Sequence, residues 1–236
     1  MSLIFPISSA GKRGGGFDPL PYNPVLWADY QDSSTIYDNA IGGNLISDGG
    51  LVGRVEDKSG NGNHLTQPVL NNRPTYTEAS AAANGYASIA APSSAGKIGL
   101  TFGSYTRVQL YLVIAYNDGL DTSFNSYNHV VGGALSNSKP RLMGRLNTND
   151  FFDNGFAPKI DGVVNYLNVL PMSLSVMRLR TTSLSLSDVT TLGYGQGNSG
   201  RSWHGVISEV IAFDYSLSAA EEDDLTSGLV NKYSIT

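Results

Sequence analysis

The chain has 236 residues, which suits one large β domain, and only 15% of them are charged, against about 25% in an average soluble protein. Its net charge of −5 argues against a protein that binds by neutralising phosphates, so we expect no nucleic-acid partner. Cysteine is absent, which excludes disulfides, cysteine-ligated zinc and thiol catalysis.

The first residues, MSLIFPIS, do not resemble a secretory signal peptide. No basic residue precedes the apolar run, and Pro6 interrupts it. No stretch of the sequence reaches the roughly 18 apolar residues that a membrane helix needs. We therefore expect a protein that is made in the cytoplasm without a signal peptide and does not insert into a membrane.

Residues 1–24 differ in composition from the rest of the chain. Glycine, proline and two adjacent basic residues dominate this segment, a mixture that neither a helix nor a sheet accommodates well. We interpret it as a flexible N-terminal arm that attaches the protein to a partner, or as a disordered leader without a role. The attachment residues would be Lys12, Arg13, Gly14, Gly15 and Gly16.

Strand patterns begin at Val25. The stretch RVQLYLVIAY at 107–116 is apolar on both faces, which predicts a strand buried on both sides. About ten short strands without intervening helices predict that residues 25–236 form one all-β sandwich or jelly roll. The other candidates, each bounded by turn residues, are VLWADY, ASIAA, KIGLTF, HVVGGAL, RLMGRL, VVNYLNV, LSVMRLR, SLSLS and HGVISEVIAF.

One α-helix is expected at the C-terminus. Ser218, followed three residues later by Glu221, forms a capping box, and the acidic residues after it suit the first turn of a helix. Leu225, Leu229 and Tyr233 are four residues apart, so they should face the sheet.

The stretch VEDKSGNGNHLTQ at 55–67 is rich in turn residues. A phosphate loop would need Gly-Lys-Ser/Thr before a helix, and this stretch continues as β structure. Its polar residues imitate an EF-hand only in part, which leaves a calcium site as the weaker alternative. We predict a structural turn in which Asp57 accepts hydrogen bonds from backbone amides. The turn residues are Asp57, Ser59, Gly60, Asn61, Gly62 and Asn63.

The carboxylates and histidines form no recognisable catalytic pattern. Glucanases of β-sandwich fold carry E-x-D-x-x-E or E-x-D-x-E on one strand, so that the carboxylates share one cleft. Here Glu209 and Asp214 fall on opposite faces of their strand, and Glu56 and Asp57 are adjacent. The sequence has no GxSxG motif, so we expect no enzymatic activity. We interpret the three histidines as structural, namely His64, His129 and His204.

Three segments between strand candidates combine aromatic and amide residues, at 117–129, 147–156 and 193–204. Proteins hold sugars with flat aromatic faces and planar hydrogen-bonding groups. The alternative is that these aromatic residues only cover the ends of the sandwich or an interface between subunits. The candidate glycan-binding residues are Tyr127, Asn149, Asp150, Phe152, Tyr194 and Trp203.

The two ends of the chain resemble a known family. VLWADYQDSSTI, DKSGNGN and RPTY near the start, and WHGVISEVIAFDYSLSAAEEDDLTSGLVNKYSI at the end, are similar to laminin-G-like, concanavalin A-like jelly-roll domains. Such domains occur in phage and prophage structural proteins and in marine bacterial surface proteins. The basic, glycine-rich leader GKRGGGFDP resembles the leader of the prophage-encoded members. Val55 stands where many relatives have Trp, which argues against sugar stacking at that position.

The resemblance implies a non-enzymatic virion component, namely a spike, fibre or decoration subunit of a phage or phage-like particle. Its expected partners are other virion proteins, bound through the arm, and a host surface polysaccharide, bound by the jelly roll. A homo-oligomer is compatible with this role, and no cofactor is implied. The alternatives are a purely architectural virion protein and a polysaccharide-cleaving enzyme of concanavalin A-like fold.

The resemblance also implies that the first strand lies beside the last. VLWADY should then pair with SEVIAFD and bring the end of the arm close to the terminal helix. Trp27 should be buried near Ile211 and Phe213, whereas Trp203 should lie at the rim and tolerate substitution.

Overall fold

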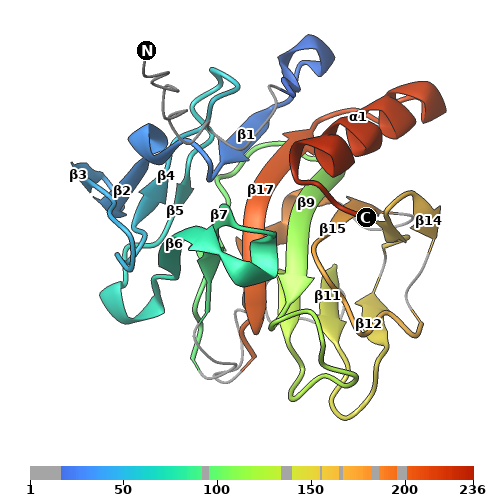
Figure 1. Ribbon diagram of the computed structural model, residues 1–236. Helices are drawn as coiled ribbons and strands as arrows, with labels where there is room; N and C mark the ends of the chain where they lie inside the picture. The colour runs from blue at the N-terminus through green and yellow to red at the C-terminus, as the bar shows by residue number, and fades with distance from the viewer. Residues whose placement is uncertain are drawn as a thin grey trace, which may run out of the picture.

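The computed structural model describes residues 17–91, 96–133, 140–154, 156–164, 167–181, 186–195 and 201–236. Within these ranges two antiparallel β-sheets face each other, and one α-helix near the C-terminus covers the outer side of one sheet (Figure 1). This arrangement confirms the expected all-β, jelly-roll-type sandwich with a C-terminal helix. The attachment residues lie outside the described ranges, namely Lys12, Arg13, Gly14, Gly15 and Gly16.

The first sheet has eight strands in the order β14-β13-β15-β9-β17-β7-β6, with β1 also paired to β17. Because β9 pairs with one edge of β17 along its length, β7 and β1 share the other edge. The strands are β1 (Leu26–Asp29), β6 (Thr75–Ser80), β7 (Tyr86–Ala90), β9 (Gln109–Tyr116), β13 (Lys159–Ile160), β14 (Val163–Val164), β15 (Ser175–Arg180) and β17 (Gly205–Phe213).

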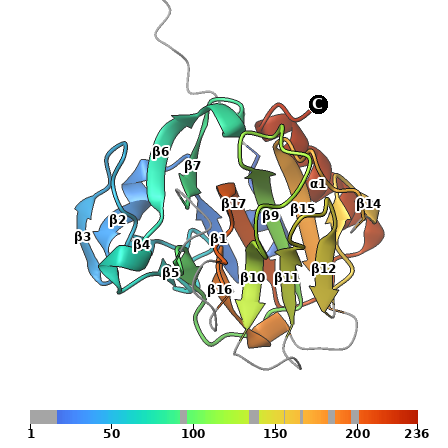
Figure 2. The same ribbon diagram turned by 90° about the horizontal axis from the view of Figure 1, so that it is seen from below.

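The second sheet has nine strands in the order β12-β11-β10-β16-β8-β5-β4-β2-β3. Figure 2 shows β10, β11 and β12 lying over β9 and β15 of the first sheet. The strands are β2 (Ile36–Asn39), β3 (Gly42–Leu45), β4 (Arg54–Val55), β5 (Leu65–Thr66), β8 (Leu100–Thr101), β10 (His129–Gly133), β11 (Arg141–Gly144), β12 (Phe151–Asn154) and β16 (Val189–Leu192).

Three of the expected strands are shorter than predicted or are replaced. Of KIGLTF, only Leu100–Thr101 is a strand, and of the described part of VVNYLNV, only Val163–Val164 is a strand. In SLSLS, the described end belongs to a 3-10 helix at Leu186–Asp188. The helices are α1 (Ala219–Lys232) and the 3-10 turns η1 (Leu20–Tyr22), η2 (Ser33–Thr35), η3 (Leu70–Asn72), η4 (Ala81–Ala83) and η5 (Leu186–Asp188).

The core has two layers, and strands β9 and β17 contribute to both. Every residue of β9 and of β17 is buried. Their inner side chains, such as Leu112 and Val210, pack between the sheets, and their outer ones, such as Val113 and Ile211, pack beneath α1. The prediction of a strand apolar on both faces at 107–116 is therefore confirmed.

The first strand lies antiparallel to the last, as the sequence predicts. Trp27 is opposite Ile211 in the register of β1 and β17. The Trp27 ring is 7% exposed and belongs to the apolar layer beneath α1, together with Ile211 and Phe213. This layer binds the start of the domain to its end.

Helix α1 begins and packs as its sequence predicts. The Ser218 N–H donates to Glu221 Oε2 at 2.8 Å, and the Glu221 N–H donates to Ser218 Oγ, which completes the capping box. Leu225, Leu229 and Tyr233 are fully buried against the first sheet.

Residues 17–24, which we name the strap, run along α1. The Tyr22 hydroxyl donates to Asp224, and the Tyr215 hydroxyl donates to the Tyr22 carbonyl at 2.7 Å. A Cβ atom at Gly228 would overlap the Phe17 ring, so glycine provides the space for that ring. The end of the arm therefore lies beside the terminal helix, as predicted.

Candidate functional site

The DKSGNGN stretch forms a compact turn that holds the start of β1. Asp57 Oδ1 accepts the N–H groups of Trp27 at 2.9 Å and Ser59 at 2.8 Å, and Oδ2 accepts that of Asn63 at 3.0 Å. Gly60 and Gly62 have φ angles of +87° and +73°, which glycine adopts without strain. These are the hydrogen bonds expected of a structural turn.

Two asparagines of the turn fasten the chain just before β1. Asn61 Nδ2 donates to the Pro24 carbonyl at 3.1 Å, and Asn63 Nδ2 donates to the Val25 carbonyl at 2.8 Å. Within the described residues, no three histidine, aspartate or glutamate side chains converge to hold a metal ion. Both Asp57 carboxylate oxygens already accept hydrogen bonds from backbone N–H groups, so the carboxylate stabilises the turn and its contact with β1.

A buried ionic cluster connects β1, β17 and α1. Lys232 Nζ lies 2.7 Å from Glu209 Oε2 and 3.2 Å from Asp29 Oδ1. Glu209 also accepts the Trp27 indole N–H at 2.8 Å and the Tyr233 hydroxyl at 2.8 Å. Burial alone would lower the pKa of Lys232, but the charges of Glu209 and Asp29 outweigh burial and raise it. Glu209 is fully buried, so this cluster stabilises the fold and does not face a substrate.

The histidines make structural contacts, as the sequence analysis interprets them. His64 Nδ1 accepts the Asp57 N–H at 3.0 Å, and His204 Nδ1 lies 2.7 Å from Asn125 Nδ2. His129 is buried, and burial lowers the pKa of its imidazole to about 4.

Two of the six candidate glycan-binding residues are in the core, which corrects their expected rim position. Trp203 is 1% exposed, and its indole N–H donates to the Ala115 carbonyl at 3.1 Å. Its ring lies among those of Tyr116 and Phe151, at centroid distances of 5.2 and 6.2 Å. Tyr194 is 7% exposed. Their loop is polar in composition, but these aromatic side chains turn inward to fill the end of the sandwich.

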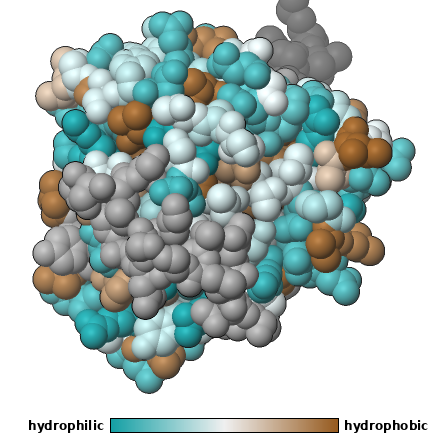
Figure 3. Space-filling model, turned by 180° about the vertical axis from the view of Figure 1, so that it is seen from behind, coloured by the Kyte–Doolittle hydropathy of each residue, from teal (hydrophilic) through white to brown (hydrophobic). Residues whose placement is uncertain are grey.

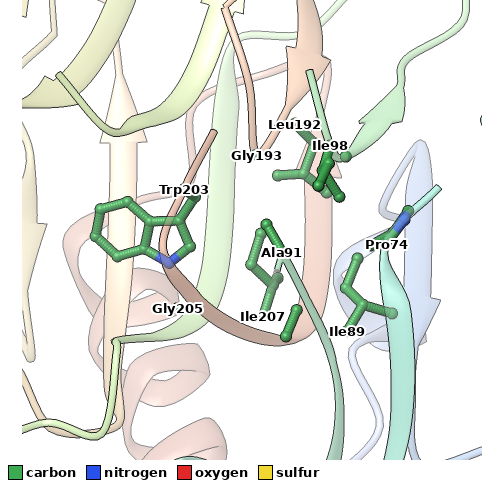
Figure 4. Close-up of a pocket in the computed structure, with 11 residues that line it drawn as sticks. Pro74, Ile89, Ala91, Ile98, Leu192, Gly193, Trp203, Gly205 and Ile207 are labelled. Atoms are coloured by element: carbon green, nitrogen blue, oxygen red, sulfur yellow. The ribbon is translucent and has the colours of Figure 1, made fainter. Parts of the chain in front are cut away.

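The cavity beside Trp203 is too small for a sugar. Figure 4 shows Trp203 and Ile207 on one side of it and Pro74 and Ile89 on the other. Its volume is about 10 Å³, which is room for about one water molecule.

Three other candidates lie together at the hairpin between β11 and β12. Asn149 Nδ2 donates to Asn168 Oδ1 at 3.2 Å, and Asp150 Oδ1 accepts the Asn168 N–H at 2.8 Å. Phe152 is half-buried on the edge strand β12, with the Arg141 guanidinium 5.2 Å from its ring centroid. Tyr127 lies apart, half-buried beneath Arg201 at 5.0 Å.

The hairpin borders an open depression of about 370 Å³, a size typical of small-ligand sites. The Asp153 carboxylate accepts the Phe156 N–H at 2.8 Å, and its partial burial raises its pKa. Arg145 is exposed, and its guanidinium has no hydrogen-bond partner in the described part of the chain. We name this site the rim depression, and it is lined by Arg145, Asp150, Phe151, Phe152, Asp153 and Leu167.

Sequence reasoning identified part of this lining. Asp150 and Phe152 were candidates because NTNDFFDNGF combines aromatic and amide residues. Arg145 was overlooked because it belongs to the strand candidate RLMGRL, and Leu167 because it belongs to VVNYLNV. No local pattern in the sequence predicts that Leu167 lies beside the hairpin between β11 and β12.

Comparisons with protein-family models, curated proteins and solved structures found no match. Among the described residues, no helix combines the length and apolar character that crossing a membrane requires. On the face seen in Figure 3, the described apolar side chains lie in separate spots among hydrophilic ones. The geometry of the rim depression is therefore the main guide to function.

Proposed function

We propose that this protein is a non-enzymatic subunit of a phage or phage-like particle, and that its jelly roll binds a surface glycan in the rim depression. One observation carries the binding proposal. An open depression of ligand size combines the half-buried ring of Phe152 with the polar groups of Arg145, Asp150 and Asp153. This is the combination of surfaces with which proteins bind sugars.

The two carboxylates of the depression are held in place before a ligand arrives. Asp150 and Asp153 each bind a backbone N–H through Oδ1, which leaves Oδ2 available to accept hydrogen bonds from sugar hydroxyls. Arg145 supplies donors, and the Phe152 ring offers an apolar surface for the C–H face of a sugar. Pre-organised groups lose little entropy on binding.

The role in a particle is supported by the sequence resemblance and by the basic, glycine-rich arm before the strap. We propose a spike, fibre or decoration subunit that the arm joins to other virion proteins. The buried position of Glu209 and the pairing of Asp29 with lysines support a binding role over polysaccharide cleavage.

Glycan binding is tested by screening the protein on an array of bacterial surface polysaccharides and titrating the best ligand. Phe152→Ala and Asp150→Asn should each weaken binding about tenfold or more, which corresponds to the loss of about 1.4 kcal/mol. Tyr37→Ala is the matched control, because Tyr37 is a half-buried aromatic residue on β2, near the opposite edge of the same sheet.

Equal affinity in Phe152→Ala and the normal protein would contradict the proposed site. An antibody against the protein should also label purified particles in electron micrographs. Labelled particles without any glycan binding would favour the purely architectural alternative. Release of new reducing ends from a polysaccharide would favour the enzyme.

A further inference from the structure

A second open cleft lies where the strap meets the turn and the end of β17. Its volume is about 560 Å³, and its walls are more polar than apolar. It is separate from the rim depression, which β12 and Leu167 line. We name it the strap cleft, and it is lined by Leu20, Asn23, Pro24, Val25, Ser59, Asn61, Asp214 and Tyr215.

The strap cleft offers hydrogen-bond acceptors that no described residue uses. Asp214 is exposed, and its carboxylate has no hydrogen-bond or ion-pair partner within the described ranges. Asn61 donates through Nδ2 to the Pro24 carbonyl and to Ser59 Oγ, so its Oδ1 atom remains open. The Tyr215 ring is held in place by its hydroxyl, which donates to the Tyr22 carbonyl at 2.7 Å.

The charge around the cleft is negative. The pKa of the Tyr215 hydroxyl is raised by partial burial and then by the negative charges of Glu221 and Asp214. The neighbouring cation, Lys58, lies 3.3 Å from Asp29 and 3.0 Å from Asp32 and is occupied there. The cleft therefore suits a cationic segment with an apolar stem.

The chain itself contains such a segment. Lys12 and Arg13 are adjacent and are followed by three glycines, which impose little constraint on the backbone. Lysine and arginine side chains each have a charged end and an aliphatic stem. In the cleft, the charged end can meet the polar acceptors while the stem lies on Leu20 and Tyr215. Arm and cleft are thus complementary in charge.

The described part of the strap begins at a distance from the strap cleft of the same chain. Leu20 lines the cleft, and Tyr22 contacts Asp224 of α1. Phe17 lies against Gly228 of the same helix. Gly228 is one helical turn beyond Asp224, which is about 6 Å further from the start of α1. Phe17, the first described residue, therefore lies beside the C-terminal half of α1, whereas the cleft lies near the N-terminal end of that helix.

We propose that the strap cleft binds the Lys12–Arg13 segment of a second copy of this chain. The proposal rests on the role of the arm in the proposed function and names its partner, and it does not depend on glycan binding. The contact joins two different surfaces, so repeating it builds a ring or a filament of subunits. Asp214 is the proposed ionic anchor, and Asn61 supplies an acceptor beside it.

The test is sedimentation of the full-length protein over a range of concentrations and salt. The normal protein should self-associate, and salt should weaken the association because the contact is ionic. Asp214→Lys should weaken it about tenfold, and the pair Lys12→Glu with Arg13→Glu should do the same. Combining all three changes should restore association, because the charges are then exchanged.

Two controls separate the cleft from general effects. Glu78→Lys makes the same charge reversal at an exposed carboxylate of β6, an edge strand of the first sheet that does not line the cleft, and should leave association unchanged. Phe152→Ala should also leave it unchanged, which distinguishes this contact from glycan binding.

A protein that sediments as a monomer throughout would overturn the proposal, because an arm bound in its own cleft gives no dependence on concentration. Association that Asp214→Lys leaves intact, or that the charge exchange does not restore, would also overturn it. Circular dichroism on each variant confirms that a loss of association is not a loss of fold.

Discussion

The surroundings of the two tryptophans differ in chemistry, although both side chains are buried. Trp27 lies beneath α1 in an ionic region, where its indole N–H donates to the carboxylate of Glu209 and Lys58 Nζ is 4.5 Å from its ring centroid. Trp203 lies between the sheets, where its N–H donates to a carbonyl and other aromatic rings surround it. One region depends on charge pairing and the other on packing.

The comparison teaches that the composition of a segment does not determine the direction of its side chains. Trp27 belongs to a strand of apolar residues, and its burial follows from that pattern. Trp203 follows a segment of Gly, Ser and Asn that is typical of a loop, yet it lies two residues before β17, every residue of which is buried. The Trp203 ring closes the end of the core.

The largest effect is expected from Trp203→Ala. Removing the ring leaves a cavity beside Tyr116 and Phe151 and leaves the Ala115 carbonyl without its donor, so we expect a loss of about 3–5 kcal/mol in the free energy of unfolding. Urea denaturation measures it, with Trp27→Ala for comparison. A loss below about 1 kcal/mol would place Trp203 outside the core.

Lys232→Met tests the ionic region. The change leaves Glu209 and Asp29 without the cation they share, and we expect a loss of about 3–5 kcal/mol. Adding Glu209→Gln removes one of the uncompensated charges, so the double variant should be more stable than the sum of the two single losses predicts. Strictly additive losses would show that the two charges do not interact.

The region around Trp203 also contains an ionisable group, His129. Its backbone forms an isolated β-bridge with that of Ser202, the residue before Trp203. Its folded-state pKa is about 4, below its unfolded value of 6.5. The unfolded state therefore binds the proton first, and stability should fall as the pH drops from about 6.5 to about 4, by on the order of 3 kcal/mol at most.

Denaturation of His129→Gln at the same pH values isolates this contribution. The variant should lack the part of the pH dependence that the imidazole causes. An identical pH dependence in the variant and the normal protein would show that His129 takes up its proton equally well in the folded state.

Asp57→Ala tests the turn that holds Trp27. It should lower the free energy of unfolding by about 1–3 kcal/mol, because three backbone N–H groups lose their acceptor. A chelator should leave the melting temperature of the normal protein unchanged. A large drop on chelation would show that the turn holds a metal ion. Asp48→Ala is the control, since that exposed carboxylate accepts a single N–H, from Glu78.

The elements that could be predicted from sequence carry strong local signals. Strand β9 is a long apolar run, and α1 has a capping box with apolar residues four apart. The predicted strand segments do not include β2 to β6, β12, β13 or β16. In β3 and β4, for example, GGNL and RV are short and polar or isolated. Their backbones are extended because neighbouring strands offer hydrogen bonds, β2 to β3 and both β2 and β5 to β4, and residue type alone does not indicate this pairing.

The same limit applies to the candidate site. The aromatic and amide residues at 147–156 identified Asp150 and Phe152, which line the rim depression. Leu167 reaches them because the Asn168 N–H binds Asp150 across 18 positions of the chain. Such a contact depends on the tertiary fold and has no counterpart in the local pattern.

Amide chemical-shift mapping with the glycan that the array identifies tests the central claim most directly. The account predicts shifts at Arg145, Asp150, Phe152 and Leu167, and none around Asn61 and Asp214 in the strap cleft. Shifts confined to the strap cleft, or a bound glycan that moves no resonance at the rim depression, would contradict the proposed site.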